Sequence, residues 1–509
     1  MKALHFPSLR TDGLIGILGL GETGLSAAQW CLDGGARVRL LDTREQMDIR
    51  SQLEGDLSQV EIVLGDLALR AEALQDIRML VISPGLSPLQ TEIAQFLQWA
   101  QEQGIELVNE IELFARALED LRAQGHEARV LAVTGTNGKT TVVSLLAHVL
   151  RAAGLTVCAA GNISPAALTA LRDCLRAGQL PQVWLIELSS FQLVYTNSLR
   201  CDAATVLNIS QDHLDWHGSM SAYVQAKAKL FELSRVQVFN RDDTQVVGML
   251  ANPNALSTRG FSAHAPERAG DLGLVLEAGL WWLSAMDKVE PELPSSSRKA
   301  PSSVVASEAQ RVSGPVNKLM PAEALQIKGR HNALNALAVL ALARELGLGW
   351  SELLHALRSY TGEPHRLQLV RVMQGVSYFD DSKGTNVGAT VAALNGLEQP
   401  LILIAGGLAK GQDFSPLAQL MSPKVKAVLL MGQDAALLAD ALANTGVPLL
   451  LQSTLEQAVA TAVEMAVQGD AVVLSPACAS MDMFRNYQHR GECFVSALTD
   501  IALDKGEAA

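Results

Sequence analysis

The sequence lacks several features that mark particular classes of protein. It contains no stretch of about 18 apolar residues without charge, so we expect no membrane-spanning helix. Its first residues, MKALHFPSLRTDGLIG, have neither the apolar core nor the small-residue cleavage site of a secretory signal peptide. The cysteines stand at positions 31, 158, 174, 201, 478 and 493, and no two form a C-x-x-C pair. We therefore expect reduced thiols and a cytoplasmic location.

Positive charge is also scarce. The 40 Lys and Arg residues are outnumbered by 53 Asp and Glu residues, which gives a formal net charge of −13. A nucleic-acid-binding protein normally presents a basic face, so we expect no nucleic-acid partner. The chain has 509 residues, of which 49% are hydrophobic and 18% charged, as is typical of globular proteins. At about 100–200 residues per domain, this length predicts about three domains.

Short apolar runs alternate with helical patterns along three blocks of the chain. Residues 14–42 combine an apolar run, a glycine turn, an amphipathic helix and a second apolar run, which predicts a β–α–β unit. We predict an α/β protein whose parallel sheets carry helices on both faces. The predicted domains are residues 1–109 and 363–509, both Rossmann-like, and residues 110–362, of the P-loop ATPase type. A Ser-, Pro- and Ala-rich stretch, residues 291–315, is expected to be a disordered insert of the middle domain.

A glycine-rich turn follows the first predicted strand. GLGETG (19–24) satisfies the pattern G-x-G-x-x-G and opens a helix, whose N-terminus favours an anion. Asp42 ends the next strand, near the spacing expected for an acid that binds a ribose. The pattern indicates a nucleotide or diphosphate ligand, and a dinucleotide cofactor remains open at this point. The alternative is a tight strand–helix turn without a ligand.

A second loop, VLAVTGTNGKTT (130–141), is more specific. It ends in G-K-T, as the phosphate-binding pattern G-x-x-x-x-G-K-[ST] requires, but Val133 stands where the first glycine belongs. Its two glycines allow backbone N–H groups to face a phosphate. Lys139 adds positive charge, and the Thr140 hydroxyl can ligate Mg²⁺. The alternative is an ordinary β–α turn with a surface lysine.

Among the polar residues of the middle block, Glu187 is a candidate for a metal site by its own position in the sequence. Glu187 follows four apolar residues at the end of a predicted strand, where a buried carboxylate needs a partner. It is either a Mg²⁺ ligand or part of a strand-end salt bridge. His213, between Asp212 and Asp215, is either a ligand or a structural residue. Lys227 lies on a predicted helix, where its residue type alone indicates a surface lysine.

The chemistry of other side chains makes them candidates for contacts with a nucleotide or a substrate. Asn332 and Asn335 share one face of a predicted helix (327–347), where an amide can read adenine. Asn332 can instead cap the helix, so Asn335 is preferred. In the third block, the Arg366 guanidinium can hold a γ-phosphate, and Lys410 can pair with a substrate carboxylate.

Two motifs of the chain resemble those of the Mur ligase family. They are the shortened phosphate loop T-G-T-N-G-K-T-T and the stretch SPACASMDMFRNYQHRG (475–491). The segments ELSSFQL, DHLDWHG, GEPHR and DDSKGTN also agree. The D-N-P-R signature of the diaminopimelate- or lysine-adding branch is absent, and the resemblance is to the D-glutamate-adding branch. Two departures are the long insert, residues 291–315, and Tyr487 where an apolar aromatic such as Phe is expected.

The resemblance implies an ATP-dependent amide ligase of peptidoglycan precursor synthesis. Its substrates would be UDP-N-acetylmuramoyl-L-alanine and D-glutamate, joined through an acyl phosphate with release of ADP and phosphate. Such an enzyme needs charge neutralisation around the γ-phosphate and two oriented substrates. ATP, two Mg²⁺ sites and a monomer are implied. Because the three blocks each supply a site, closure of the domains is expected.

The resemblance also implies roles for particular residues. The ATP site would comprise Gly135, Thr136, Asn137, Gly138, Lys139, Thr140, Thr141, Asn335, Arg366, Asp381 and Lys383. Catalytic residues would be Lys139, Glu187, His213 and Lys227, with Thr140, Glu187, His213 and a carbamylated Lys227 as metal ligands. The UDP-sugar would contact Leu20, Thr23, Asp42, Thr43, Arg44, Ser83, Gly85, Asn162, Ser190 and Gln192. D-Glutamate would contact His365, Thr385, Lys410, Ser480, Met481 and Tyr487.

Carbamylation would change what Lys227 can bind. An ammonium group has only hydrogen-bond donors, so it cannot ligate Mg²⁺. A carbamate formed with CO₂ has two oxygens and a negative charge, which suit a hard cation.

Other functions account for fewer of these motifs. A nicotinamide-dependent oxidoreductase would use GLGETG and Asp42 but would leave the loop at 134–141 and Glu187 without a role. A non-catalytic nucleotide-binding regulator has no need of the metal-site residues. A sister ligase that adds another amino acid is the nearest enzymatic alternative.

Overall fold

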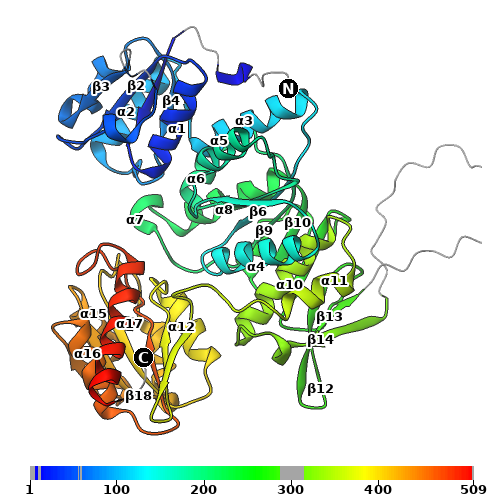
Figure 1. Ribbon diagram of the computed structural model, residues 1–509, viewed down its shortest axis with the longest axis vertical. Coiled ribbons are helices and arrows are strands. Elements are labelled where there is room, and N and C mark those ends of the chain that lie inside the picture. Colours follow the sequence, from blue (N-terminus) through cyan, green and yellow to red (C-terminus); the bar gives the residue numbers. More distant parts are fainter. Residues whose placement is uncertain (1–5, 10–12, 56, 58–59, 287–313, 507–509) are drawn as a thin grey trace, which may run out of the picture. The chain divides into compact units, whose positions relative to one another are not determined.

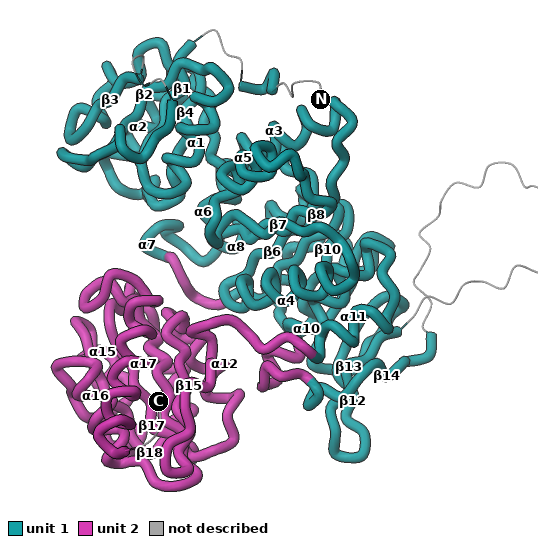
Figure 2. The backbone as a smooth tube through the Cα atoms, viewed as in Figure 1, with its two compact units in different colours: residues 1–209, 214–324, 334–358 teal, residues 210–213, 325–333, 359–509 magenta. Residues whose placement is uncertain are grey.

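The structure is a computed structural model that describes residues 6–9, 13–55, 57, 60–286 and 314–506. Residues 291–313 of the expected insert lie outside the described residues. The chain divides into two compact units, shown in different colours in Figure 2. Unit 1 comprises residues 1–209, 214–324 and 334–358, and unit 2 comprises residues 210–213, 325–333 and 359–509. None of the helices in the described ranges is long and apolar enough to cross a membrane.

Three sheets, one in each predicted block, form the framework (Figure 1). The first is entirely parallel, in the order β3-β2-β1-β4-β5. Its elements are β1 (Leu14–Leu18), α1 (Glu22–Asp33), β2 (Val38–Asp42), β3 (Glu61–Leu64), β4 (Ile77–Ile82), α2 (Thr91–Glu102) and β5 (Glu106–Val108). Along β1, Ile15 and Ile17 pack with α1, whereas Leu14 and Leu18 pack with α2. Both faces of this sheet are therefore buried, as expected for a strand that is apolar throughout.

The second sheet has nine strands, in the order β14-β13-β12-β11-β10-β9-β6-β8-β7. Its strands are β6 (Arg129–Thr134), β7 (Val157–Gly161), β8 (Val183–Glu187), β9 (Cys201–Val206), β10 (Ser234–Asn240), β11 (Thr258–Ser262), β12 (Leu272–Glu277), β13 (Leu280–Met286) and β14 (Val316–Pro321). The helices of this block are α3 (Glu110–Ala123), α4 (Lys139–Ala152), α5 (Ala167–Ala177), α6 (Ser190–Val194), α7 (Leu214–His217), α8 (Met220–Glu232), α9 (Thr244–Gly248), α10 (Arg330–Arg344) and α11 (Trp350–Leu357).

The third sheet lies in unit 2, in the order β15-β16-β20-β17-β18-β19. Its strands are β15 (Gln368–Met373), β16 (Val376–Asp380), β17 (Leu401–Gly406), β18 (Val425–Met431), β19 (Leu449–Leu451) and β20 (Ala471–Leu474). Its helices are α12 (Val387–Gly396), α13 (Ser415–Ala418), α14 (Met421–Lys424), α15 (Ala435–Leu442), α16 (Leu455–Met465) and α17 (Tyr487–Asp504). Leu403 and Ala405 of β17 face one core cluster, and Ile402 and Ile404 face the other.

The second and third sheets are not wholly parallel, which the sequence patterns did not predict. β12–β13–β14 and β15–β16 pair antiparallel. Two-residue turns explain both hairpins, because Ala278–Gly279 and Gln374–Gly375 all have positive φ. A two-residue turn of this kind reverses the direction of the chain, so the strands on either side pair antiparallel. Parallel neighbours need a much longer crossover connection.

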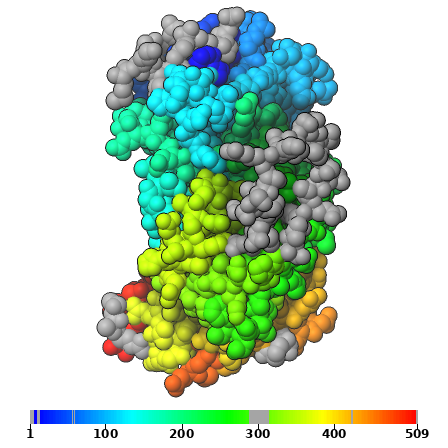
Figure 3. All heavy atoms as spheres, turned by 90° about the vertical axis from the view of Figure 1, so that its right-hand side faces the viewer, coloured from blue at the N-terminus to red at the C-terminus, as the bar shows by residue number. Residues whose placement is uncertain are grey.

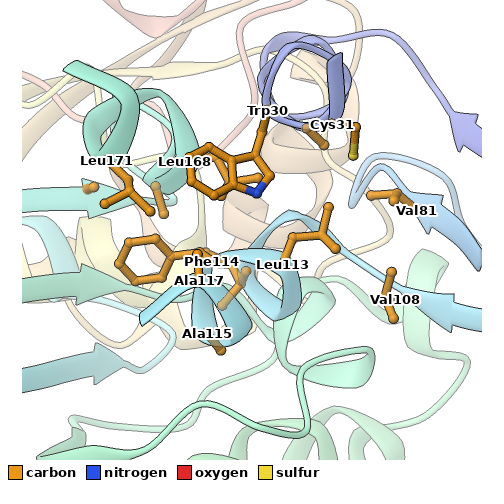
Figure 4. Close-up of a cluster of buried hydrophobic side chains, with 14 of the residues drawn as sticks. Trp30, Cys31, Val81, Val108, Leu113, Phe114, Ala115, Ala117, Leu168 and Leu171 are labelled. Atoms are coloured by element: carbon orange, nitrogen blue, oxygen red, sulfur yellow. The ribbon is translucent and has the colours of Figure 1, made fainter. Parts of the chain in front are cut away.

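A single hydrophobic cluster joins the first sheet to the middle block within unit 1. It brings together Trp30 of α1, Phe114 of α3 and Leu168 of α5 (Figure 4). In the space-filling view, the cyan atoms near residues 110–125 lie against green atoms of the middle block (Figure 3). Helix α3 therefore packs on both blocks, and a domain limit at residues 109–110 remains a prediction.

Candidate active site

The loop predicted to bind phosphate joins β6 to α4. Gly135 and Gly138 have φ of +152° and +83°, values that favour glycine. A Cβ atom on Gly138 would lie 2.9 Å from Oδ1 of Asn335, so a larger residue at position 138 would force the Asn335 side chain to move. Lys139 Nζ donates to the carbonyls of Gly135 and Thr136, both at 2.9 Å. The loop therefore presents its lysine beside the N-terminus of α4, where an anion is favoured.

Side chains from neighbouring strands and helices fix the shape of this loop. The hydroxyls of Thr136 and Tyr223 are 2.9 Å apart. The Asn137 N–H donates to Asn208 Oδ1 at 2.8 Å, and Asn208 Nδ2 donates back to the Asn137 carbonyl at 3.1 Å. Sequence reasoning missed Asn208, which follows β9. Thr140 and Thr141 lie in the first turn of α4, which begins at Lys139, and both are buried.

Glu187 ends β8, next to β6 in the sheet. Its side chain is 1% exposed, and Oε1 accepts a hydrogen bond from Asn162 Nδ2 at 2.8 Å. Oε2 is buried and has no hydrogen-bond partner among the described residues. A buried carboxylate oxygen without a donor is costly unless a cation or a ligand donor satisfies it.

Lys227 of α8 is buried beside the same loop. Its Nζ donates to the Thr134 hydroxyl at 3.2 Å and to the Gly135 carbonyl at 2.9 Å. It also lies 4.9 Å from the ring centroid of Tyr223. Lys227 is not a surface lysine, because its residue is only 2% exposed.

The structure separates the two asparagines of α10. Asn335 is buried and lies against Gly138 of the phosphate loop. Asn332 donates from Nδ2 to the Lys328 carbonyl at 2.8 Å, a local bond at the start of the helix. Of the two asparagines, Asn335 is therefore the one in contact with the loop, and its contact with a nucleotide remains a prediction.

His213 belongs to unit 2, with φ of +55°. Its backbone N–H donates to Asp212 Oδ1 at 2.9 Å, and its Nε2 lies 3.5 Å from Asp212 Oδ2. Asp212 is buried and also accepts from Asn386 Nδ2 at 3.3 Å, whereas Asp215 is exposed. Among the described residues there is no cluster of three or more His, Cys, Asp or Glu side chains that could hold a metal.

In the first block, Asp42 closes the glycine-rich turn. Its Oδ2 accepts from the Leu20 N–H at 2.7 Å, and both oxygens accept from the Arg44 guanidinium at 2.8 Å. Burial would raise its pKa, but the hydrogen bonds from Arg44 and Leu20 prevail and lower the pKa of Asp42 to about 2. Asp42 is therefore a fixed support for the turn, and Arg44 stays exposed at its edge.

The other residues predicted for the UDP-sugar lie on two blocks of unit 1. The hydroxyls of Thr23 and Ser83 are 3.3 Å apart, and Gly85 has open space around it. Thr43 is exposed.

The remaining two of these residues, Ser190 and Gln192, lie in α6. Ser190 is buried, and its hydroxyl lies 2.9 Å from His217 Nε2. The Gln192 amide oxygen accepts from Ser189 in a capping box at the start of α6, which gives Gln192 a structural role as well.

In unit 2, Asp380 ends β16 and Asp381 directly follows the strand. Asp380 Oδ2 pairs with His365 Nδ1 at 2.6 Å. Asp381 accepts from the Ser475 hydroxyl at 2.7 Å and the Leu367 N–H at 3.1 Å. Burial raises the pKa of the Asp381 carboxyl to about 7, although Ser475 opposes this shift.

Basic residues surround this pair of aspartates. Arg366 has a buried Nε that hydrogen-bonds no group among the described residues. Lys383 Nζ lies 5.1 Å from the ring centroid of Tyr487, and the rings of His365 and Tyr487 are 6.2 Å apart. Unit 2 thus brings His365, Lys383 and Tyr487 together.

Arg490 of α17 connects the loop after β16 to the loop after β20 by hydrogen bonds. It is fully buried and donates to the Ser382 hydroxyl at 3.0 Å, the Ser382 carbonyl at 2.8 Å and the Cys478 carbonyl at 3.2 Å. Burial lowers its pKa to about 10. Sequence reasoning quoted this arginine within a motif but gave it no role.

The residues predicted to contact D-glutamate differ in exposure. Ser480 is buried, Thr385 is half-buried, and Met481 is 67% exposed. Lys410 is exposed and has a φ of +53° in the loop after β17. No contact to a substrate follows from these positions alone, so these assignments remain predictions.

Comparison with known proteins agrees with this architecture. Family models match the chain over residues 14–109 (Mur ligase MurD-like, N-terminal domain), 133–343 (Mur ligase middle domain) and 365–478 (Mur ligase, glutamate ligase domain). The crystal structure of UDP-N-acetylmuramate-alanine ligase MurC from Thermotoga maritima has a TM-score of 0.53 and 19% identity, and the match covers 96% of this chain and 100% of that one. MurF ligase from the same organism, in complex with ADP, has a TM-score of 0.55 and 16% identity over 98% of each chain. These structures confirm the predicted three-domain α/β fold.

Sequence relatives are much closer. The chain is 52% identical over 498 residues to UDP-N-acetylmuramoylalanine--D-glutamate ligase of Bordetella avium, covering 97% of each chain. It is 49% identical over 491 residues to the protein of that name from Ralstonia nicotianae, covering 96% of this chain and 97% of the relative. The fold, the phosphate loop and these relatives define an enzyme of the ligase class. The chain belongs to the Mur ligase family, as its motifs predicted.

Proposed function

We propose that this enzyme joins D-glutamate to UDP-N-acetylmuramoyl-L-alanine, with cleavage of ATP to ADP and phosphate. The substrate carboxylate attacks the γ-phosphorus of ATP and displaces ADP, giving an acyl phosphate. The amine of D-glutamate then attacks the acyl carbon, loses a proton and expels phosphate. The names of the relatives support this choice of substrates, and the phosphate loop supports the use of ATP.

The observation that carries the proposal is the arrangement around the phosphate loop. The loop ends at the N-terminus of α4, Lys139 lies over it, and Glu187 is one strand away. Backbone N–H groups, the lysine and the helix N-terminus stabilise negative charge on the transferred phosphoryl group. Asn335, which lies beside Gly138, would contact the adenine.

The unsatisfied oxygen of Glu187 fits a magnesium ion. Glu187 Oε2 and the Thr140 hydroxyl would hold the ion, which would neutralise the developing charge of the γ-phosphate. The absence of a carboxylate cluster among the described residues is compatible with this assignment, because Mg²⁺ usually takes only one or two protein carboxylates beside phosphate and water. We also propose that His213 contributes to binding a second ion. Lys227 would be carbamylated, a modification that labelled CO₂ and carbon NMR would detect.

Unit 2 supplies the remaining roles. Arg366, with its unsatisfied Nε, and Lys383 would contact the transferred phosphate, and Asp381 the ribose. Thr385, Lys410, Ser480 and Tyr487, with His365 and Met481, would hold D-glutamate. We further propose that the enzyme is monomeric and works in the cytoplasm, where ATP is available.

The test is ADP release with a panel of D- and L-amino acids. We expect release only when UDP-N-acetylmuramoyl-L-alanine and D-glutamate are both present with Mg²⁺. Preference for another amino acid would instead identify a sister ligase, and release without the UDP-sugar would refute the proposed reaction.

A further inference from the structure

A histidine outside the predicted site contacts one of the residues expected to bind the sugar. His217 ends the short helix α7, and its Nε2 lies 2.9 Å from the hydroxyl of Ser190. Both residues are buried, with exposures of 9% for His217 and 2% for Ser190. At this depth, each polar atom needs a defined partner, so the contact fixes the direction of the Ser190 hydroxyl.

Aromatic side chains hold the His217 ring in place. The ring stacks on Phe191 at a centroid distance of 5.6 Å with an interplanar angle of 24°. It meets Trp216 at 4.6 Å and the edge of Tyr223 at 5.3 Å. A ring packed on several sides loses little further freedom on forming its hydrogen bond, so it orients its partner well.

The same aromatic group reaches the phosphate loop. Tyr223, in contact with His217, pairs its hydroxyl with that of Thr136 at 2.9 Å. Ser190 itself lies three positions after Glu187, at the start of α6. Tyr223 thus connects the His217 ring to the phosphate loop, and Ser190 connects it to α6.

We propose that His217 is a positioning residue for the UDP-sugar substrate. This inference rests on the proposed function and on the expected role of Ser190. His217 donates its Nε2–H to the Ser190 oxygen, which leaves the Ser190 hydroxyl hydrogen free to donate to a substrate oxygen. The substrate carries carbonyl and carboxylate oxygens, which are acceptors, so this arrangement matches its chemistry.

Substitutions at position 217 separate this role from simple packing. In His217→Gln, the side-chain amide can occupy the place of Nε2 and donate to Ser190, whereas in His217→Asn it is too short. We expect His217→Asn and His217→Phe to raise KM for the UDP-sugar about three- to tenfold, with kcat and KM for ATP within about twofold of wild type. His217→Gln should restore KM to within about twofold. His148→Gln is the control, because His148 Nε2 contacts the Ala356 carbonyl instead.

A double-mutant cycle with Ser190→Ala provides the decisive comparison. If His217 acts through Ser190, His217→Phe should have no further effect on KM in the Ser190→Ala background. Additive effects would overturn the proposal, as would equal effects of His217→Gln and His217→Asn. If His217→Phe fails to fold, the Gln and Asn variants decide between the two outcomes.

Binding of UDP-N-acetylmuramoyl-L-alanine, measured by calorimetry without ATP, distinguishes failure of this proposal from failure of the proposed function. No binding to the wild-type protein would refute the function itself. Wild-type binding that His217→Asn leaves unchanged would refute only the role of His217.

Discussion

Asn162 donates a hydrogen bond to one carboxylate oxygen of Glu187 at 2.8 Å, and the other oxygen is buried without a hydrogen-bond partner among the described residues. The strand β8 places this carboxylate beside β6, which leads into the phosphate loop. A half-satisfied buried carboxylate lowers the stability of the protein unless something binds it. We interpret this arrangement as a site kept ready for a cation.

Replacing Glu187 with Gln should separate activity from stability. We expect Glu187→Gln to lower kcat at least about a hundredfold, because the ligand for the cation is weakened. The melting temperature should stay the same or rise, because the amide carries no charge to bury. ADP release at several Mg²⁺ concentrations and thermal unfolding would measure both effects.

Glu112→Gln is the matched control for that substitution. Glu112 is equally buried, but its oxygens accept from the Asn197 and Ser198 N–H groups and from Arg116. This variant should lose stability without a change in Mg²⁺ dependence. A stable Glu187→Gln enzyme with normal turnover would remove Glu187 from the metal site.

Two glycines with the same φ of +83° test the phosphate loop. In Gly138→Ala, the new Cβ would lie 2.9 Å from Asn335 Oδ1, whereas at Gly154 it would meet nothing within 4 Å. Each substitution should cost about 1 kcal/mol of folding free energy from backbone strain. Only Gly138→Ala should also raise KM for ATP, by about tenfold or more. Equal ATP kinetics in both variants would count against the role of this loop.

Asp42 should make the first block sensitive to acid. Its pKa in the folded protein is about 2, below the ordinary value of 3.8, so it stabilises the fold above about pH 4. That stability is lost as the pH falls from about 4 to about 2, because protonation breaks the bonds from Arg44 and Leu20. Because Arg44 is exposed, we expect a contribution of about 1–2 kcal/mol.

The variant Asp42→Asn isolates this contribution. It should be less stable than wild type at pH 7 and should show a smaller loss of stability between pH 4 and 2. Hydrogen exchange of the segment 14–44 at several pH values would measure the difference. An unchanged acid profile would mean that the contact with Arg44 does not stabilise the turn.

Asp381 should change the stability of the protein with pH in the opposite direction to Asp42. Burial raises its pKa from 3.8 to about 7, so the folded state favours the protonated form. The stability gained from proton binding is fully present below about pH 4 and is lost as the pH rises through about 7. Asp381→Asn cannot titrate, so unit 2 of this variant should lose less stability over that interval. Hydrogen exchange of residues 376–384 at pH 5 and 8 would test this, and equal pH dependence in both proteins would contradict it.

Features encoded by local patterns could be predicted from the sequence. The apolar runs and glycines predicted a strand–loop–helix at 130–141 and a strand that ends at Glu187, and the structure has these elements there. The order of the strands and helices followed from the same alternation. The hairpins did not, because their turns depend on positive φ at Ala278 and Gln374, residue types that do not mark such turns.

Contacts between distant parts of the chain could not be predicted. Asn208 binds Asn137 across 71 positions, and Arg490 binds Ser382 across 108. Asn208 has no spacing or neighbour that distinguishes it from an ordinary polar side chain, and the motif that contains Arg490 does not indicate its partners. The hydrogen bonds of Asp42 to Arg44 and Leu20 were not predicted for another reason. The spacing of Asp42 from the glycine-rich turn indicated contact with a ligand, and it did not indicate that Asp42 stabilises this turn.

The most direct test of the central claim is to follow oxygen from the substrate carboxylate. UDP-N-acetylmuramoyl-L-alanine labelled with a heavy oxygen isotope in that carboxylate is incubated with the enzyme, ATP, Mg²⁺ and D-glutamate, and the released phosphate is analysed by mass spectrometry. If the carboxylate is phosphorylated, one labelled oxygen appears in the phosphate. Unlabelled phosphate from a productive reaction would contradict the acyl-phosphate route.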